Sequence, residues 1–103
     1  MHTYEDLISM SAQKIHDLLM TLNPQLDNRP YWTDANAALR LLDHVVSCDF
    51  TVKHGYLNLM IYNKNDLMLV DIYDDEKIGL VKCLVMAYIM ALEEEASSKI
   101  NKE

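Results

Sequence analysis

The chain of 103 residues has few of the residues that interrupt or crosslink a protein fold. It contains two glycines and two prolines, and no stretch of it is rich in glycine or serine. This scarcity argues against disorder and against a long linker. Half of the residues are hydrophobic, which is enough to bury a core without metal ions or disulfides. We therefore expect one globular domain over residues 1–103.

Cysteine is also scarce, since the chain has only Cys48 and Cys83. Neither belongs to a CxxC pair, which excludes zinc-ribbon and thioredoxin-type sites, so we expect free thiols in a reducing compartment. The chain does not open on a basic and then apolar segment, so we expect no secretory signal. The longest apolar run, residues 78–92, is too short for a bilayer and contains Lys82. These features predict a cytoplasmic protein without a membrane partner.

Catalytic motifs are lacking as well. Gly55 and Gly79 are isolated, so no phosphate loop is formed, and no G-x-S-x-G elbow is present. No two of the four histidines have the i, i+4 spacing of a metal-binding helix. The acidic run near residue 75 lacks the alternating ligands of a calcium loop, and helix capping explains it better. We expect no enzyme activity, no cofactor and no metal.

Charge of one sign predominates, because sixteen acidic residues against nine basic ones give a net charge of −7. Such a chain repels phosphate backbones, so we expect no direct binding to nucleic acid. The charge suits a basic protein surface, including one that normally holds nucleic acid. The alternative is that the charge only maintains solubility.

The spacing of apolar residues predicts three helices, over residues 4–22, from 33 or 34 to 46, and from 76 to 97 or beyond. Thr3 is placed to cap the first helix. The inward face of the second is expected to contain Ala38, Leu41 or Leu42, Val45 and Val46. The third is apolar on most of its circumference and must be covered on more than one side. For that reason we expect a homodimer, formed through the third helix or through the second face of the sheet.

Alternating side chains predict three strands between the second and third helices, at residues 49–53, 56–62 and 67–73. Short connections make them an antiparallel meander, so the fold class is α+β with the order α-α-β-β-β-α in a layered sandwich. One face is expected to be a core face, formed by Phe50, Val52, Leu57, Leu59, Ile61, Met68, Val70 and Ile72. The other face is rich in tyrosine and methionine.

Residues 29–38, RPYWTDANAA, resemble the P-Y-S-T-D-x-x-A-A opening of the phage ABA sandwich domain, a family of small bacteriophage proteins. Residues 80–87, LVKCLVMA, are similar to the closing helix of that family, with the lysine and the cysteine in swapped order. The resemblance covers residues 29–95, between the first helix and a polar tail at 96–103, and departs from the family at Trp32. It implies a phage or prophage origin and a sheet between helix layers, and it transfers no catalytic residue.

Two surfaces are candidates for binding a partner. One is acidic and consists of Asp74, Asp75 and Glu76, where carboxylates also suit the start of a helix. The other is the tyrosine-rich sheet face, with Tyr56, Tyr62 and Tyr73. The acidic surface is slightly favoured, because a helix layer over the second sheet face would bury the tyrosines.

We expect a small acidic phage-type interaction protein that binds and inhibits a host protein in the bacterial cytoplasm, as anti-CRISPR proteins do. One alternative is a binder of small molecules such as signalling nucleotides. That role requires basic groups to converge, for which an oligomer would have to bring Lys53, Lys64 or Arg40 together. The other alternative is a structural or regulatory phage protein without a role in defence.

Overall fold

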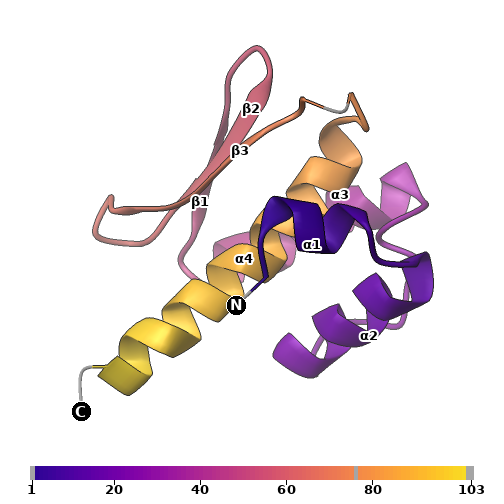
Figure 1. Ribbon diagram of the computed structural model, residues 1–103. Coiled ribbons are helices and arrows are strands. Elements are labelled where there is room, and N and C mark those ends of the chain that lie inside the picture. Colours follow the sequence, from indigo (N-terminus) through magenta and orange to yellow (C-terminus); the bar gives the residue numbers. More distant parts are fainter. Residues whose placement is uncertain (1, 76, 102–103) are drawn as a thin grey trace.

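Four helices and a three-stranded antiparallel sheet make up the computed structural model, which describes residues 2–75 and 77–101, the side chains of 98–101 excepted. This architecture confirms the predicted α+β class (Figure 1). In chain order the elements are α1 (Tyr4–Ile8), α2 (Ala12–Leu22), α3 (Ala35–Ser47), β1 (Thr51–His54), β2 (Asn58–Tyr62), β3 (Met68–Tyr73) and α4 (Leu80–Asn101).

The predicted helix at residues 4–22 is in fact two helices. Thr3 begins α1 with a capping box, in which its Oγ1 accepts the N–H of Asp6 and its own N–H donates to the Asp6 carboxylate. Ser9 ends α1, and the hydroxyl of Ser11 caps α2 by accepting the N–H of Lys14. Serine hydroxyls compete for backbone groups, which favours helix ends at these positions over a continuous helix.

The last helix begins at Leu80 and not near residue 76 as predicted. The chain before it is a loop, in which the Asp74 carboxylate accepts the N–H groups of Ile78 at 2.8 Å and Gly79 at 3.1 Å. Gly79 has a φ of 101°, which a residue with a side chain rarely adopts. Asp74 therefore organises the loop that leads into α4.

The sheet has the order β1-β2-β3 with antiparallel neighbours, as a meander requires. Ile61 pairs with Val70, but Tyr62 pairs with Met68, so β3 has an extra residue at Leu69. This bulge turns Met68 to the same face as Tyr62. Met68 is 53% exposed, and its predicted place on the core face is wrong.

The helices lie on one face of the sheet (Figure 1). Within the described residues, α4 packs on β2 and β3, α3 contacts β1, and α2 packs on α4. The structure thus has a helix layer and a sheet layer, whereas the resemblance implied helices on both faces of the sheet. The second sheet face is open.

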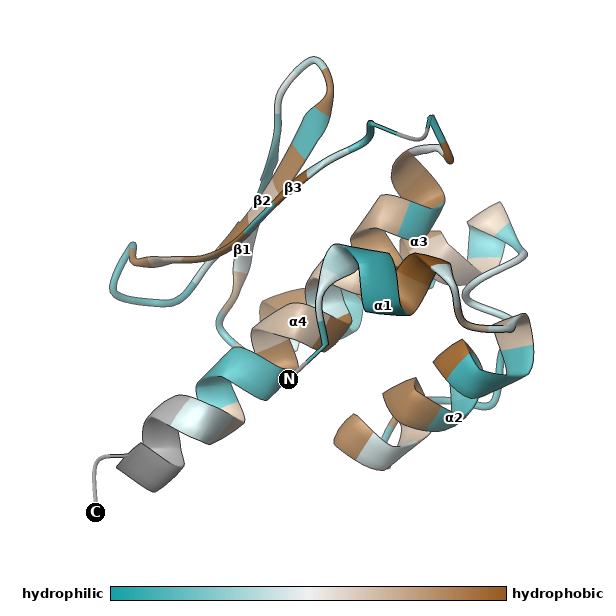
Figure 2. Ribbon diagram, in the orientation of Figure 1, coloured by the Kyte–Doolittle hydropathy of each residue, from teal (hydrophilic) through white to brown (hydrophobic). Residues whose placement is uncertain are grey.

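The central element of the core is α4, whose residues 83–89 are all buried. Figure 2 shows its hydrophobic first part against the other elements and its hydrophilic later part extending away from them. The sheet, α2 and α3 together cover it, which accounts for the wide apolar circumference. On α3, Leu41 and Val45 face this core, but Val46 is 66% exposed, so its predicted inward position is wrong.

Candidate functional site

The acidic surface is smaller than the sequence predicted. The Asp74 carboxylate is bonded to backbone N–H groups of its own loop, and Glu76 lies outside the described residues. Asp75 is exposed. Further along, Glu93 binds the N–H and the imidazole Nδ1 of His2 at 3.0 and 2.8 Å. Asp75 is therefore the one member of the predicted acidic set that the structure describes with its carboxylate facing solvent.

Tyrosine and methionine side chains gather on the open side of the sheet, which we call the sheet face. The strand register arranges them in three rows, because residues paired across strands point to the same side. The rows consist of Thr51, Tyr62 and Met68, then Lys53, Met60 and Asp71, and then Asn58 and Tyr73.

Contacts between neighbours order the sheet face. The Lys53 ammonium lies 4.8 Å from the centre of the Tyr62 ring, within the range of a cation–π interaction. The Tyr62 hydroxyl lies 3.7 Å from the Met60 sulfur, and the Asn58 amide donates to the Asp71 carboxylate at 3.0 Å. The contacts with Lys53 and Met60 hold the half-buried Tyr62 in a fixed orientation. Tyr73, at the other end of the face, is 56% exposed.

Tyr56 lies apart from the other two candidate tyrosines. It is in the connection between β1 and β2 and is 97% exposed. It lines a cleft of about 240 Å³ together with Asp74, Leu80 and Cys83, which belong to the helix side of the sheet. The structure therefore places Tyr62 and Tyr73 on the sheet face, and places Tyr56 beside Asp74.

A second, almost wholly apolar groove of about 240 Å³ lies between α3, β1 and the start of α4. Leu39, Val52 and Leu80 line it, and Leu39 and Leu80 are exposed. This groove was not predicted from the sequence, since Leu39 was assigned to neither face of its helix. The signal that could have found it is the recurrence of apolar residues on the outer side of α3.

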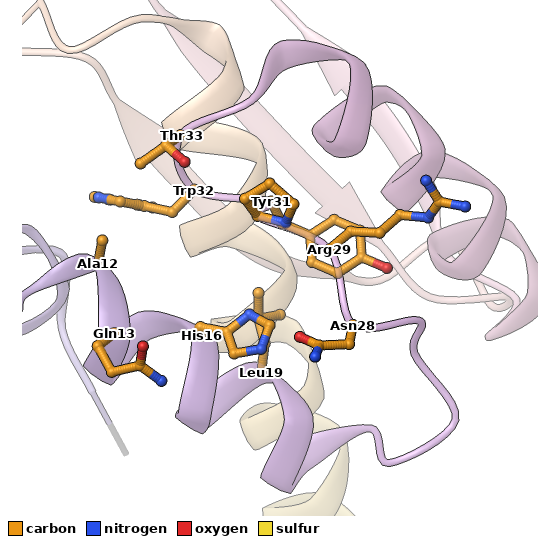
Figure 3. A pocket seen from close by; sticks show the side chains of 10 residues that line it. Ala12, Gln13, His16, Leu19, Asn28, Arg29, Tyr31, Trp32 and Thr33 are labelled. Atoms are coloured by element: carbon orange, nitrogen blue, oxygen red, sulfur yellow. The ribbon is translucent and has the colours of Figure 1, made fainter.

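A recess of about 290 Å³ with a buried aromatic residue at its base lies between α2 and residues 28–33 (Figure 3). Tyr31 is buried there, and its hydroxyl donates to the carbonyl oxygen of Asp27 at 2.9 Å. His16 and Asn28 point toward each other across it, and Trp32 forms one wall (Figure 3). Its lining includes Arg29 and His16 but no acidic residue, although the Arg29 guanidinium points away (Figure 3).

The motif that resembles the phage family thus has a structural role as well. Tyr31 and Trp32 are both buried, and the Lys82 ammonium lies 5.2 Å from the centre of the Trp32 ring. Asp34 caps α3 by accepting the N–H of Asn36 at 3.0 Å.

The Cys83 thiol is poorly suited to nucleophilic chemistry. Cys83 is buried, and burial raises the pKa of its thiol to about 11. Cys48 is half-buried, and its sulfur lies 3.7 Å from the Tyr88 hydroxyl. Both are free cysteines, as expected. Among residues 2–75 and 77–97, no three histidine, cysteine or acidic side chains are grouped so that they could hold a metal ion.

Comparison with other proteins gives no family. No protein-family model matches the chain, and no curated protein or solved structure shows significant similarity to it. The resemblance to the phage ABA sandwich domain therefore stays a prediction. Within the described chain, none of the helices has the length and apolar composition needed to cross a membrane.

Proposed function

We propose that this protein is a binding domain that contacts another protein through the sheet face. The observation behind the proposal is that one side of the sheet is uncovered and presents Tyr62, Tyr73, Met60 and Met68 to solvent. Tyrosine and methionine are enriched in the cores of protein interfaces. The solvent-facing side of an antiparallel sheet normally has polar side chains, so these tyrosines and methionines call for an explanation.

The order within the sheet face supports the same proposal. Tyr62 is already held by Lys53 and Met60, so little side-chain entropy remains to be lost when a partner binds. Lys53 and Asp71 lie next to each other in the middle row and have opposite charges. The face is thus locally neutral in a protein with a net charge of −7.

The partner in this proposal is a host protein in the bacterial cytoplasm, and the consequence of binding is its inhibition. Support comes from the resemblance to phage proteins, whereas the sheet face itself is locally neutral and does not select a partner by charge. The domain needs no catalytic group, cofactor or nucleic acid for this role.

The test is capture of host proteins on the immobilised chain, followed by measured affinities for the protein that is captured. Tyr62→Ala and Tyr73→Ala should each weaken binding by about 2 kcal/mol if they are central to the interface. Tyr56→Ala is the matched control, because this tyrosine is exposed but lies outside the sheet face. Equal affinity for all three variants and the unchanged protein would refute the proposal, as would loss of binding in Tyr56→Ala alone.

The recess beside Trp32 supports a second candidate function, the binding of a small molecule. Its volume of about 290 Å³ is near the lower end for ligand pockets. Lys53, Lys64 and Arg40 do not line it, which disfavours a nucleotide with several phosphates. Trp32 is the only tryptophan, so its fluorescence would report binding directly. Unchanged Trp32 emission across a chemically diverse library of small molecules would count against this candidate.

A structural or regulatory phage role without any part in defence is distinguished from host inhibition by genome neighbourhood. Neighbouring anti-defence genes support inhibition. A position among genes for virion components supports the structural role.

A further inference from the structure

The outer side of α3 has a second apolar stripe, which we call the α3 stripe. It consists of Ala35, Leu39, Leu42 and Val46, and it is separate from the buried residues on the inner side of the helix. At 100° per residue, its four members lie within about 60° of one another. Leu39 is 60% exposed, and Leu42 is half-buried. Such a continuous stripe on a solvent-facing helix is typical of a helix that packs against another.

The sheet is too narrow to cover this side of α3. Three strands about 4.8 Å apart span about 10 Å between the outer strands. Two helices packed side by side are about 20 Å across with their side chains. Since α4 occupies β2 and β3, the main contact of α3 with the sheet is with β1. The apolar groove between α3 and β1, where Leu39 and Leu42 meet Leu80, is the remaining gap.

The spacing of the α3 stripe reads the same in both directions, since its residues are separated by four, three and four positions. An antiparallel copy of the same helix therefore presents the same pattern in reverse. In that arrangement Ala35 lies opposite the partner's Val46, and Leu39 lies opposite the partner's Leu42. The small residue faces the larger one, and the spacing is that of a coiled-coil seam.

The charges beside the stripe fit a second copy of this chain. Arg40 and Asp43 are exposed on the same flank of α3. The antiparallel register places Arg40 within reach of the partner's Asp43, and places Asp43 within reach of the partner's Arg40. The stripe itself has no charge, so pairing brings no like charges into contact despite the net charge of −7. We propose that the protein forms a two-fold symmetric homodimer through the α3 stripe, and that the neighbouring groove receives side chains of the second copy.

The first test is sedimentation of the full chain from micromolar to millimolar concentration, in which a dimer is expected. Leu39→Glu should weaken dimerisation about a hundredfold, because the symmetric interface loses the leucine twice. Leu67→Glu is the matched control, since Leu67 is 63% exposed and lies in the connection between β2 and β3. Both leucines are solvent-facing, so neither variant should lose its fold. A monomer throughout, or equal weakening by the two variants, would overturn the proposal.

The second test addresses the antiparallel register. Arg40→Asp gives two acidic side chains on the flank, and Asp43→Arg gives two basic ones. Each variant alone should dimerise less than the unchanged protein, and the mixture should form a mixed dimer preferentially at low salt. If the mixture of the two variants dimerises no better than each variant alone, the antiparallel register is wrong. If the protein is a monomer but Leu39→Glu abolishes capture of a host protein, the stripe binds that protein and self-association is wrong.

Discussion

Replacing Asp74 by alanine should destabilise the fold without removing a binding residue. The carboxylate accepts two backbone N–H groups, from Ile78 at 2.8 Å and from Gly79 at 3.1 Å. A hydrogen bond to a charged group contributes about 1.5–3 kcal/mol, and half-burial of Asp74 together with access of water to the freed N–H groups reduces the sum. We expect a loss of about 2 kcal/mol in the free energy of unfolding.

Urea denaturation followed by far-UV circular dichroism measures this loss as a lower midpoint with an unchanged m-value. Asp75→Ala is the matched control, since Asp75 is an exposed neighbour for which no hydrogen bond is seen within the described residues, and it should change stability by less than about 0.5 kcal/mol. Equal midpoints for Asp74→Ala and the unchanged protein would refute the structural role of this carboxylate.

Two further predictions concern buried groups around α4. Burial raises the pKa of the Cys83 thiol to about 11 from an ordinary value of 9.0, so the neutral thiol is favoured in the fold. The contribution of Cys83 to stability should be constant below pH 9.0 and fall between pH 9.0 and about 11, where the unfolded thiol ionises first, and the total fall should be smaller in Cys83→Ala. Part of the fall above pH 10.0 remains in that variant, because burial also raises the pKa of Tyr88 above its ordinary value of 10.0. Tyr88→Phe removes the hydroxyl that accepts from the Asn23 amide at 2.9 Å and should cost about 1 kcal/mol in thermal unfolding. An unchanged melting temperature would show that this buried hydrogen bond contributes nothing.

The strands could be predicted from the sequence because one face of the sheet is buried. Leu59, Ile61, Val70 and Ile72 alternate with more exposed residues, and a period of two is specific to strands. The face of Met68 was predicted wrongly because a bulge shifts the register within the strand pair, and the composition of the strand does not indicate a bulge.

The break between α1 and α2 could not be predicted from the spacing of apolar residues either. Leu7 and Ile15 are both buried and keep helical spacing across the two serines, so periodicity alone continues through the gap. The start of α4 was missed for a related reason. Asp74 was taken for a helix cap, whereas it bonds a loop that ends at Gly79 in a left-handed conformation.

Side-chain alternation placed Tyr62 and Tyr73 on one face of the sheet, which the structure confirms. Whether a helix covers that face depends on how the layers pack, and no local pattern determines it. The same alternation placed Tyr56 on this face, which is wrong because Tyr56 lies in the connection between β1 and β2, where alternation ends. The exposure of Leu39 could not be predicted for the same reason. An apolar residue on the outer side of a helix is distinguished from a core residue only by its neighbours in space.

The affinity of the captured partner for Tyr62→Ala, compared with Tyr56→Ala, tests the central claim most directly. The measurement is made at low and at high salt, because Lys53 and Asp71 on the sheet face cancel in charge and salt should matter little. We predict about thirtyfold weaker binding for Tyr62→Ala at both salt concentrations and unchanged binding for Tyr56→Ala. Unchanged affinity of a folded Tyr62→Ala protein, with binding that falls steeply with salt, would contradict the account and favour the acidic surface.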